Sequence, residues 1–143
     1  MKSTKRRKMF FLAILIVLAA GLFWRSFPFR IVDISGKKFV ANLALTREEQ
    51  RKGLGGRDRL CGRCAMLFDF KDKNKYSFWM KDMKFDLDII WISDGRIVYI
   101  KKNFSRHSPE TIAPDSYADK VLEINSGISS KFGFEIGDAV KIY

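Results

Sequence analysis

The sequence predicts a mostly β fold: a single compact β-barrel or β-sandwich domain of about seven or eight strands with two short helices, preceded by one N-terminal transmembrane helix. Three observations predict this arrangement. From residue 31 onward, apolar and polar residues alternate over short segments, as in strands. Glycine, proline or polar turns separate these segments. An unbroken apolar stretch from Met9 to Trp24 precedes them.

The apolar stretch predicts a membrane anchor within residues 9–25. As a helix, its 16 apolar residues measure about 24 Å, against a hydrocarbon core of about 30 Å. Lys8 and Arg25 extend the span, because their long side chains reach toward the interface. The positive-inside rule places the basic tail, residues 1–8, in the cytoplasm. We therefore expect a single-pass protein of the cell membrane, with an extracytoplasmic domain and the membrane as a partner.

A cleaved signal peptide is the alternative interpretation of the same stretch. Two tolerable cleavage sites end at Ala19 and Ala20. The apolar run continues past them through Leu22, Phe23 and Trp24, which favours a retained anchor. Both interpretations place the rest of the chain outside the cytoplasm.

The positive charge does not indicate nucleic-acid binding. The formal net charge is +11, but residues 1–30 hold seven of the 27 Lys and Arg residues and no acidic residue. The rest of the chain carries 20 basic and 16 acidic residues, which is ordinary for a solvated surface. We therefore expect no nucleic-acid partner, and the sequence predicts no cofactor.

Residues 26–37 are expected to form a linker and the first strand, and residues 38–143 the β domain. Thr46 and Glu49 make a capping box, and Gly53 is a natural stop, so a short helix is expected between them. The expected strands are residues 30–34, 37–45, 65–70, 76–81, 85–92, 96–102, 120–125 and 138–143.

Turn signals predict how these strands connect. Asp94-Gly95 is the strongest hairpin signal in the chain and joins the strands on either side of it. The polar turn at residues 71–75 makes the strand after it the expected hairpin partner of the strand before it. Residues 103–119 have no periodicity, and a loop of that length is usually functional or mobile. The segment 126–133 predicts a second helical turn.

Cys61 and Cys64 form a C-x-x-C pair with three interpretations. Outside the cytoplasm, a small disulfide that pins the loop is the simplest. A thiol–disulfide oxidoreductase is the second, although a thioredoxin-type motif opens a helix and this one leads into a strand-like run. A zinc site is the third, but it needs two further ligands and His107 is the only histidine. We therefore expect no metal.

Trp79 lies between Ser77 and Lys81 on one face of an expected strand. The other face would carry Tyr76, Phe78 and Met80. If both faces are covered, Trp79 is a core residue. If its face is open, the indole is a stacking platform rimmed by Lys81 for a sugar, an aromatic group or a peptide.

Three acidic residues follow this tryptophan. Asp82, Asp86 and Asp88 share strand parity, with Lys84 between them, so they form either a divalent-cation site or a partly neutralised strand end. Asp88 lies among apolar residues and needs a cationic or hydrogen-bonding partner. A hydrolase that uses Asp88 with His107 is a weaker hypothesis.

Five segments of the sequence resemble one protein family. They are "GLGGRDRL", "AMLF", "FWMKDMKFDLDII", "VLEINSG" and "FEIGDAV", in that order, and the resemblance spans roughly residues 38–143. The family is domain-of-unknown-function family 192 (DUF192). The resemblance implies a compact, mostly β domain, often behind an N-terminal signal or anchor, and no established activity.

The resemblance also suggests a shared site. Where the family usually has glycine, this chain has Ala65, and Cys61 and Cys64 are outside the general family pattern. The matching residues that would belong to a shared ligand-binding site are Arg57, Met66, Trp79, Lys81 and Asp88.

Together these features predict a membrane-anchored, extracytoplasmic β domain whose site binds a small molecule, a glycan or an envelope polypeptide. The sequence assigns no catalytic residue. The enzyme alternatives are the oxidoreductase based on Cys61 and Cys64 and the hydrolase based on Asp88 and His107.

Overall fold

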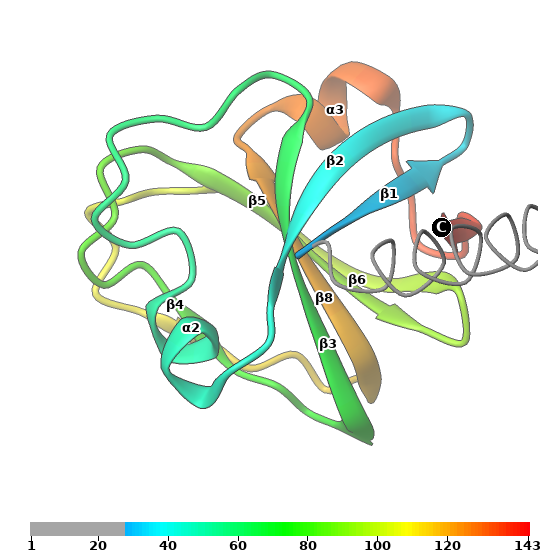
Figure 1. The fold of residues 1–143 in the computed structure, drawn as a ribbon, viewed down its shortest axis with the longest axis horizontal. Helices are drawn as coiled ribbons and strands as arrows, with labels where there is room; N and C mark the ends of the chain where they lie inside the picture. Colours follow the sequence, from blue (N-terminus) through cyan, green and yellow to red (C-terminus); the bar gives the residue numbers. More distant parts are fainter. Residues whose placement is uncertain (1–27) are drawn as a thin grey trace, which may run out of the picture.

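The structure is a computed structural model that describes residues 28–143. Over this part of the chain the fold is mostly β with two short helices, as the sequence predicts, and it has nine strands where seven or eight were expected (Figure 1). The basic tail and the apolar stretch at residues 9–25 lie outside the described residues. Within residues 28–143, no helix is long and apolar enough to cross a membrane.

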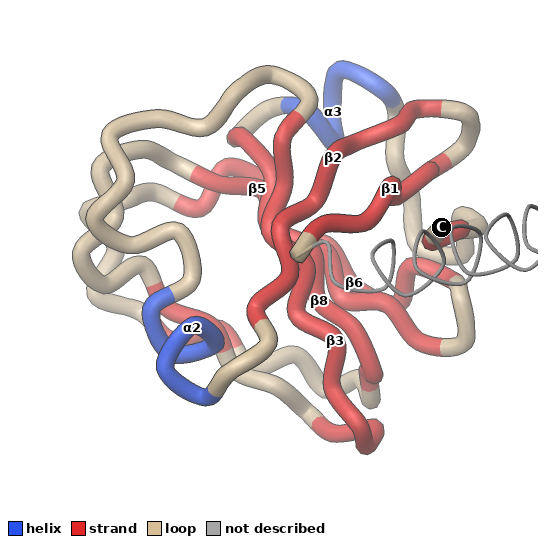
Figure 2. Tube along the Cα trace, in the orientation of Figure 1, coloured by secondary structure: helices blue, strands red, loops and turns tan. Residues whose placement is uncertain are grey.

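Seven strands form one curled sheet in the order β6-β5-β8-β3-β2-β1-β9, and the other two form a separate small pair (Figures 1 and 2). All neighbours in the large sheet are antiparallel except β2 and β3. The strands of the sheet are β1 (Phe29–Ile34), β2 (Lys37–Ala44), β3 (Cys64–Asn74), β5 (Leu87–Ser93), β6 (Arg96–Phe104), β8 (Ala118–Asn125) and β9 (Val140–Ile142). The small pair is β4 (Phe78–Trp79) with β7 (Thr111–Ile112), and the helices are α2 (Arg47–Lys52) and α3 (Ile128–Phe132).

The sheet is a half-barrel, which corrects the expectation of a closed barrel or a sandwich. Its two edge strands approach each other at one end only, where Arg96 and Ala139 form an isolated bridge. The backbone N–H of Val140 donates to the carbonyl of Gly95 at 2.7 Å beside that bridge. Because β9 has only three residues, it is too short to pair with β6 along its length.

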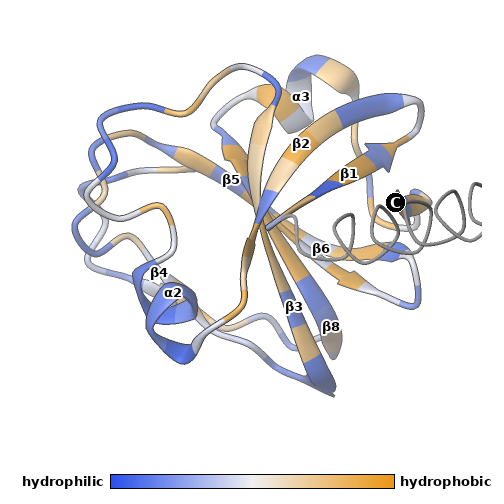
Figure 3. Cartoon of the chain, in the orientation of Figure 1, coloured by the Kyte–Doolittle hydropathy of each residue, from blue (hydrophilic) through white to orange (hydrophobic). Residues whose placement is uncertain are grey.

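Apolar side chains cover both faces of the sheet, which explains the continuous apolar run in β5. Ile90 and Ile92 face one cluster, to which all seven strands contribute. Leu87, Ile89 and Trp91 face a second cluster, which Leu54, Phe78 and Met80 cover from loops and from β4. Hydrophobic and hydrophilic segments alternate along several strands of the sheet (Figure 3).

Most predicted elements are confirmed. The capping box is present, because Thr46 Oγ1 accepts from the backbone N–H of Glu49 while Glu49 Oε2 accepts from that of Thr46. Gly53 caps the carboxyl end of α2, because its backbone N–H donates to a carbonyl of that helix. Gly133 caps α3 in the same way. The hairpin across Asp94-Gly95 joins β5 to β6.

The expected hairpin across residues 71–75 is wrong. The polar segment stays extended, so β3 continues to Asn74, and β4 pairs with β7 rather than with β3. β8, rather than β4, is the antiparallel neighbour of β3. The indole N–H of Trp91 donates to the carbonyl of Tyr76 at 2.8 Å, which ties the chain after β3 to β5. The expected loop at residues 103–119 accordingly contains β7.

Candidate functional site

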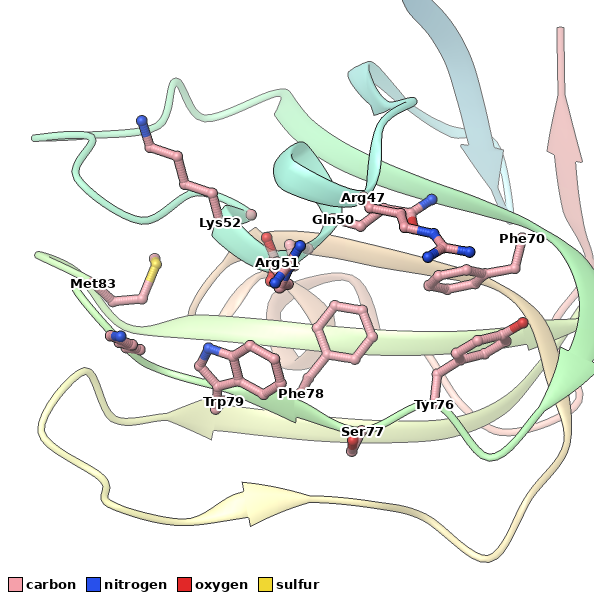
Figure 4. A pocket seen from close by; sticks show the side chains of 13 residues that line it. Arg47, Gln50, Arg51, Lys52, Phe70, Tyr76, Ser77, Phe78, Trp79 and Met83 are labelled. Carbon is pink, nitrogen blue, oxygen red and sulfur yellow. The ribbon is translucent and has the colours of Figure 1, made fainter.

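A cavity of about 450 Å³ lies between α2, β4 and the sheet. Its volume lies within the usual range for small-molecule sites. Two families of side chains dominate its lining: aromatic rings from β3, β4 and the chain just before β4, and basic groups from α2 and the turn after β4 (Figure 4).

The aromatic wall consists of Phe70, Tyr76, Phe78 and Trp79. Phe70 and Tyr76 stack with their ring centroids 3.6 Å apart, at one end of the cavity (Figure 4). Phe78 packs edge-on against Phe68 and is buried. Trp79 is 40% exposed, so its ring is not satisfied by core packing and remains open toward the cavity.

The mouth of the cavity is basic. Arg47, Arg51 and Lys52 come from α2, and Lys81 from the turn after β4. Arg47 and Arg51 extend from the helix toward the aromatic rings (Figure 4). All four side chains are exposed, and none of them takes part in an ion pair within residues 28–143. The mouth therefore carries four basic side chains that no ion pair within the described residues neutralises, and two acidic residues, Glu48 and Asp82, line an adjoining hollow with three of them.

Glu123 supplies the acidic group of the cavity. It lies on β8 opposite Met66 of β3 and Ile89 of β5, and it is only 4% exposed. Its Oε2 atom is buried and has no hydrogen-bond partner in the described protein. Burial raises the pKa of this carboxyl to about 8, although the backbone N–H of Leu54 and the charge of Arg57 both act to lower it.

Gly53 gives the chain its close approach to Glu123. A Cβ at Gly53 would stand 3.2 Å from Oε2 and 3.4 Å from Oε1 of Glu123. The glycine also has φ +53°, in the left-handed region that favours glycine. α2 can therefore end directly over the carboxyl, and its last turn delivers Arg51 and Lys52 to the cavity.

The structure brings together four of the five expected site residues in two adjoining hollows. Trp79 and Lys81 line the main cavity. Arg57 and Met66 line a second hollow that shares Lys52 and Gly53 with the first. The two hollows lie on the face of the sheet that carries Glu123.

Asp88 lies elsewhere, on the opposite face of the sheet. It is fully buried, and it shares strand parity with Ile90 of the other cluster. Its Oδ1 accepts from the backbone N–H of Asn103 at 2.8 Å and of Gly127 at 3.1 Å, and its Oδ2 from that of Ser129 at 2.8 Å. The expected partner is therefore three backbone amides, and the carboxylate ties the end of β6 to the start of α3.

The remaining acidic candidates do not lie together in one site. Asp86 accepts from the backbone N–H of Arg106 at 2.8 Å, and the two side chains form an ion pair at 3.6 Å. Asp82 and His107 are exposed, and no hydrogen bond or ion pair within the described residues joins His107 to Asp88. A search of the same residues found no group of three or more His, Cys, Asp or Glu side chains placed to hold a metal ion.

Cys61 and Cys64 form a disulfide in the loop that leads into β3. Asn125 holds this loop, because its Nδ2 donates to the carbonyls of Leu60 and Cys61 at 3.1 and 3.0 Å. The pair opens a strand rather than a helix, so it lacks the helix N-terminus that stabilises a thiolate in thioredoxin-type enzymes.

Sequence reasoning missed Glu123 and the arginines of α2. The signal for Glu123 was the one that singled out Asp88: an acidic residue within an apolar strand, here Val121-Leu122-Glu123-Ile124. The arginines carry no such signal, since a basic residue on a short exposed helix is ordinary.

The fold and the site define a class: a small β half-barrel with one aromatic-walled cavity that has a basic mouth and a buried carboxyl. The model of the family DUF192, described as "Uncharacterized ACR", matches residues 30–142. The chain therefore belongs to the DUF192 family, as its sequence motifs indicate.

Two solved structures have the same fold. A proposed transcription regulator from Sinorhizobium meliloti 1021 is 27% identical with a TM-score of 0.74, and the match covers 80% of this chain and 92% of that one. A protein of unknown function from Novosphingobium aromaticivorans DSM 12444 is 30% identical with a TM-score of 0.72, and the match covers 79% of this chain and 83% of that one. None of the curated proteins compared with the chain matches it.

Proposed function

We propose that this protein is a membrane-anchored, extracytoplasmic binding domain whose cavity holds a small molecule with an apolar or aromatic body and an anionic group. The apolar stretch at residues 9–25, with five positive charges before it, supports the anchor and its orientation. The 20 basic and 16 acidic residues after residue 30 argue against a nucleic-acid partner.

The single observation that carries the proposal is the placement of Trp79. A tryptophan side chain is large and apolar, and it is usually well buried in a folded protein. Here the indole is 40% exposed at the edge of a cavity of about 450 Å³, beside an exposed lysine. An exposed aromatic face over a cavity is suited to stacking on a ligand.

The basic mouth supports the anionic group. Arg47, Arg51 and Lys81 have no acidic partner in the described chain, so an incoming carboxylate or phosphate meets charges that are already unpaired. Guanidinium groups recognise both anions through paired hydrogen bonds.

The same geometry favours a small molecule over a glycan or an envelope polypeptide. The stacked rings of Phe70 and Tyr76 lie at one end of the cavity, and Glu123 lies in its lining (Figure 4). A polymer that runs across the surface would need an open groove in both directions. Neither enzyme alternative gains support, because Asp88 is occupied by backbone amides and the cysteine pair opens a strand.

The proposal is tested with 3-phenylpropionylglycine, which has one aromatic ring and one carboxylate. Purified full-length protein is titrated with this compound by isothermal calorimetry, in parallel with its uncharged amide. We expect millimolar or tighter binding of the acid, weaker binding of the amide, and at least a tenfold loss for the acid in Trp79→Ala. Tyr117→Ala is the matched control, since Tyr117 is exposed and outside the lining of this cavity. Failure of every compound that carries both an aromatic ring and a carboxylate to bind at millimolar concentration would refute the proposal.

A further inference from the structure

Glu123 is the only acidic side chain in the lining of the main cavity as the structure describes it. It is more than nine-tenths buried, and its Oε2 atom makes no hydrogen bond within residues 28–143. Buried polar atoms are nearly always satisfied, so an unpartnered carboxyl oxygen on a residue that lines a cavity points to a ligand group. When the carboxyl is ionised, that group must donate a hydrogen bond or carry a positive charge.

The charges of the cavity are ordered by depth. Arg47, Arg51 and Lys81 are exposed at the mouth, whereas Glu123 is buried in the sheet. A ligand that enters this field lowers its energy by placing a positive group inward and a negative group outward. A purely anionic ligand would leave Oε2 unpartnered, and a purely cationic one would have to pass the basic mouth.

We propose that the cavity recognises an amphoteric ligand, with an ammonium group bound to Glu123 and an acidic group bound at the basic mouth. This is the chemistry of amino-acid derivatives and of short peptides with a free N-terminus. The inference rests on the proposed function, because it names the ligand class of the same cavity.

The aromatic wall fits the same ligand. Phe78 and Trp79 line the cavity together with Glu123, and aromatic faces attract an ammonium group as well as an apolar side chain (Figure 4). The volume of about 450 Å³ is large enough for a small ligand but not for a folded partner. One aromatic residue with a further small residue is therefore a suitable probe.

Proton binding gives an independent readout. Burial raises the pKa of Glu123 to about 8, so without ligand the carboxyl is mostly protonated at neutral pH. An ammonium group favours the ionised form, and binding should release a proton. The charge of Arg57, from the loop after α2, acts on this carboxyl, and the four basic residues of the mouth line the same cavity. The partners on β3 and β5 are the apolar Met66 and Ile89.

The experiment uses a matched series of three compounds on the purified full-length protein. Phenylalanylglycine carries both charges, 3-phenylpropionylglycine lacks only the ammonium group, and phenylalanylglycinamide lacks only the carboxylate. We expect phenylalanylglycine to bind at least tenfold more tightly than either of the others. Its affinity should rise by up to tenfold per unit between pH 5.5 and 7, while that of 3-phenylpropionylglycine should not rise.

Glu123→Gln keeps the shape of the protonated carboxyl and removes its charge. In this variant we expect the advantage of phenylalanylglycine and its pH dependence to disappear, with the affinity for 3-phenylpropionylglycine unchanged. Glu135→Gln is the matched control at an exposed position. A thermal melt of each variant verifies that it folds.

The outcomes separate the two proposals. If phenylalanylglycine and 3-phenylpropionylglycine bind equally, or if Glu123→Gln retains the difference between them, the amphoteric ligand is refuted and the anion-binding cavity stands. If no compound of the series binds at millimolar concentration, the cavity is not a site for such ligands and both proposals fail.

Discussion

Gly53 and Glu123 lie so close to each other across the end of α2 that any side chain at Gly53 would press on the carboxyl. A Cβ there would stand 3.2 Å from Oε2 of Glu123, closer than most Cβ contacts in proteins. The glycine thus sets both the position of the helix end and the depth at which the carboxyl lies.

The first prediction concerns this contact. Gly53→Ala should lower the free energy of unfolding by about 1–3 kcal/mol, because φ +53° is unfavourable for alanine and the added methyl group meets the carboxyl. Urea unfolding of the variant measures the loss. Gly62→Ala is the control, since a Cβ at Gly62 meets nothing within 4 Å. Equal effects of the two substitutions would contradict the proposed crowding.

The second prediction concerns the pH dependence of stability. The folded state raises the pKa of Glu123 from 4.5 to about 8, so between these values it binds more protons than the unfolded chain. Stability from this group is therefore fully present below about pH 4.5 and is lost as the pH rises toward 8, by up to about 1.4 kcal/mol per unit.

Urea unfolding at pH 5, 6.5 and 8 tests this loss. Because other carboxyl groups contribute as well, the relevant quantity is the difference between the wild type and Glu123→Gln. We expect that difference to grow in favour of the glutamine variant as the pH rises. A difference that is constant with pH would show that the carboxyl is not perturbed by burial.

The third prediction separates the two tryptophans of the described domain. Trp91 is fully buried, so Trp91→Ala should cost about 3–5 kcal/mol, as truncation of a core aromatic residue does. Trp79 is 40% exposed, and Trp79→Ala should cost about 1 kcal/mol while abolishing most binding. Thermal or urea melts of both variants decide. Comparable large losses would make Trp79 a structural residue.

The fourth prediction concerns Asp88. Asp88→Asn should destabilise the fold by about 3 kcal/mol, because an amide group cannot accept from all three backbone N–H groups and brings its own donors against them. Ligand binding per folded molecule should not change, since Asp88 lies on the other face of the sheet. Asp82→Asn is the control at an exposed residue with φ +58°, which asparagine tolerates.

The fifth prediction concerns the anchor. Full-length protein should remain in the membrane fraction through an alkaline carbonate wash, because we propose that the apolar segment at residues 9–25 is a membrane anchor. Residues 31–143, expressed alone, should be soluble and folded, because the long apolar stretch lies before residue 31. Release of the full-length product into the wash with a new N-terminus near Ala20 would instead establish a cleaved signal peptide.

Local sequence signals were sufficient wherever the stabilising contact is local. The capping box of Thr46 and Glu49 closes within three residues, and the Asp94-Gly95 turn joins adjacent strands. Both were predicted from the sequence and are present. For Trp79, strand alternation left open whether another element covers the ring, and the structure leaves this residue 40% exposed.

The hairpin across residues 71–75 failed because its outcome depends on distant partners. β8 pairs with the edge of β3, and the indole N–H of Trp91 donates to the carbonyl of Tyr76. A local sequence pattern can indicate neither contact, because both partners lie far along the chain. The sequence did not identify the hydrogen-bond partners of Asp88 for the same reason. The three backbone amides that donate to it come from residues 15 to 41 positions further along the chain.

By itself the sequence determined that this is a mostly β domain of the DUF192 family. Alternating apolar residues, turn residues and helix caps act over a few neighbouring residues, so they can be recognised directly in the sequence. Only the tertiary structure decided which polar groups share a cavity. The half-barrel puts Glu123 of β8 beneath the end of α2 and beside Trp79 of β4, while it turns Asp88 to the other face. Strand parity fixes the face, but the pairing of distant strands and the path of the chain over them decide what lies across it.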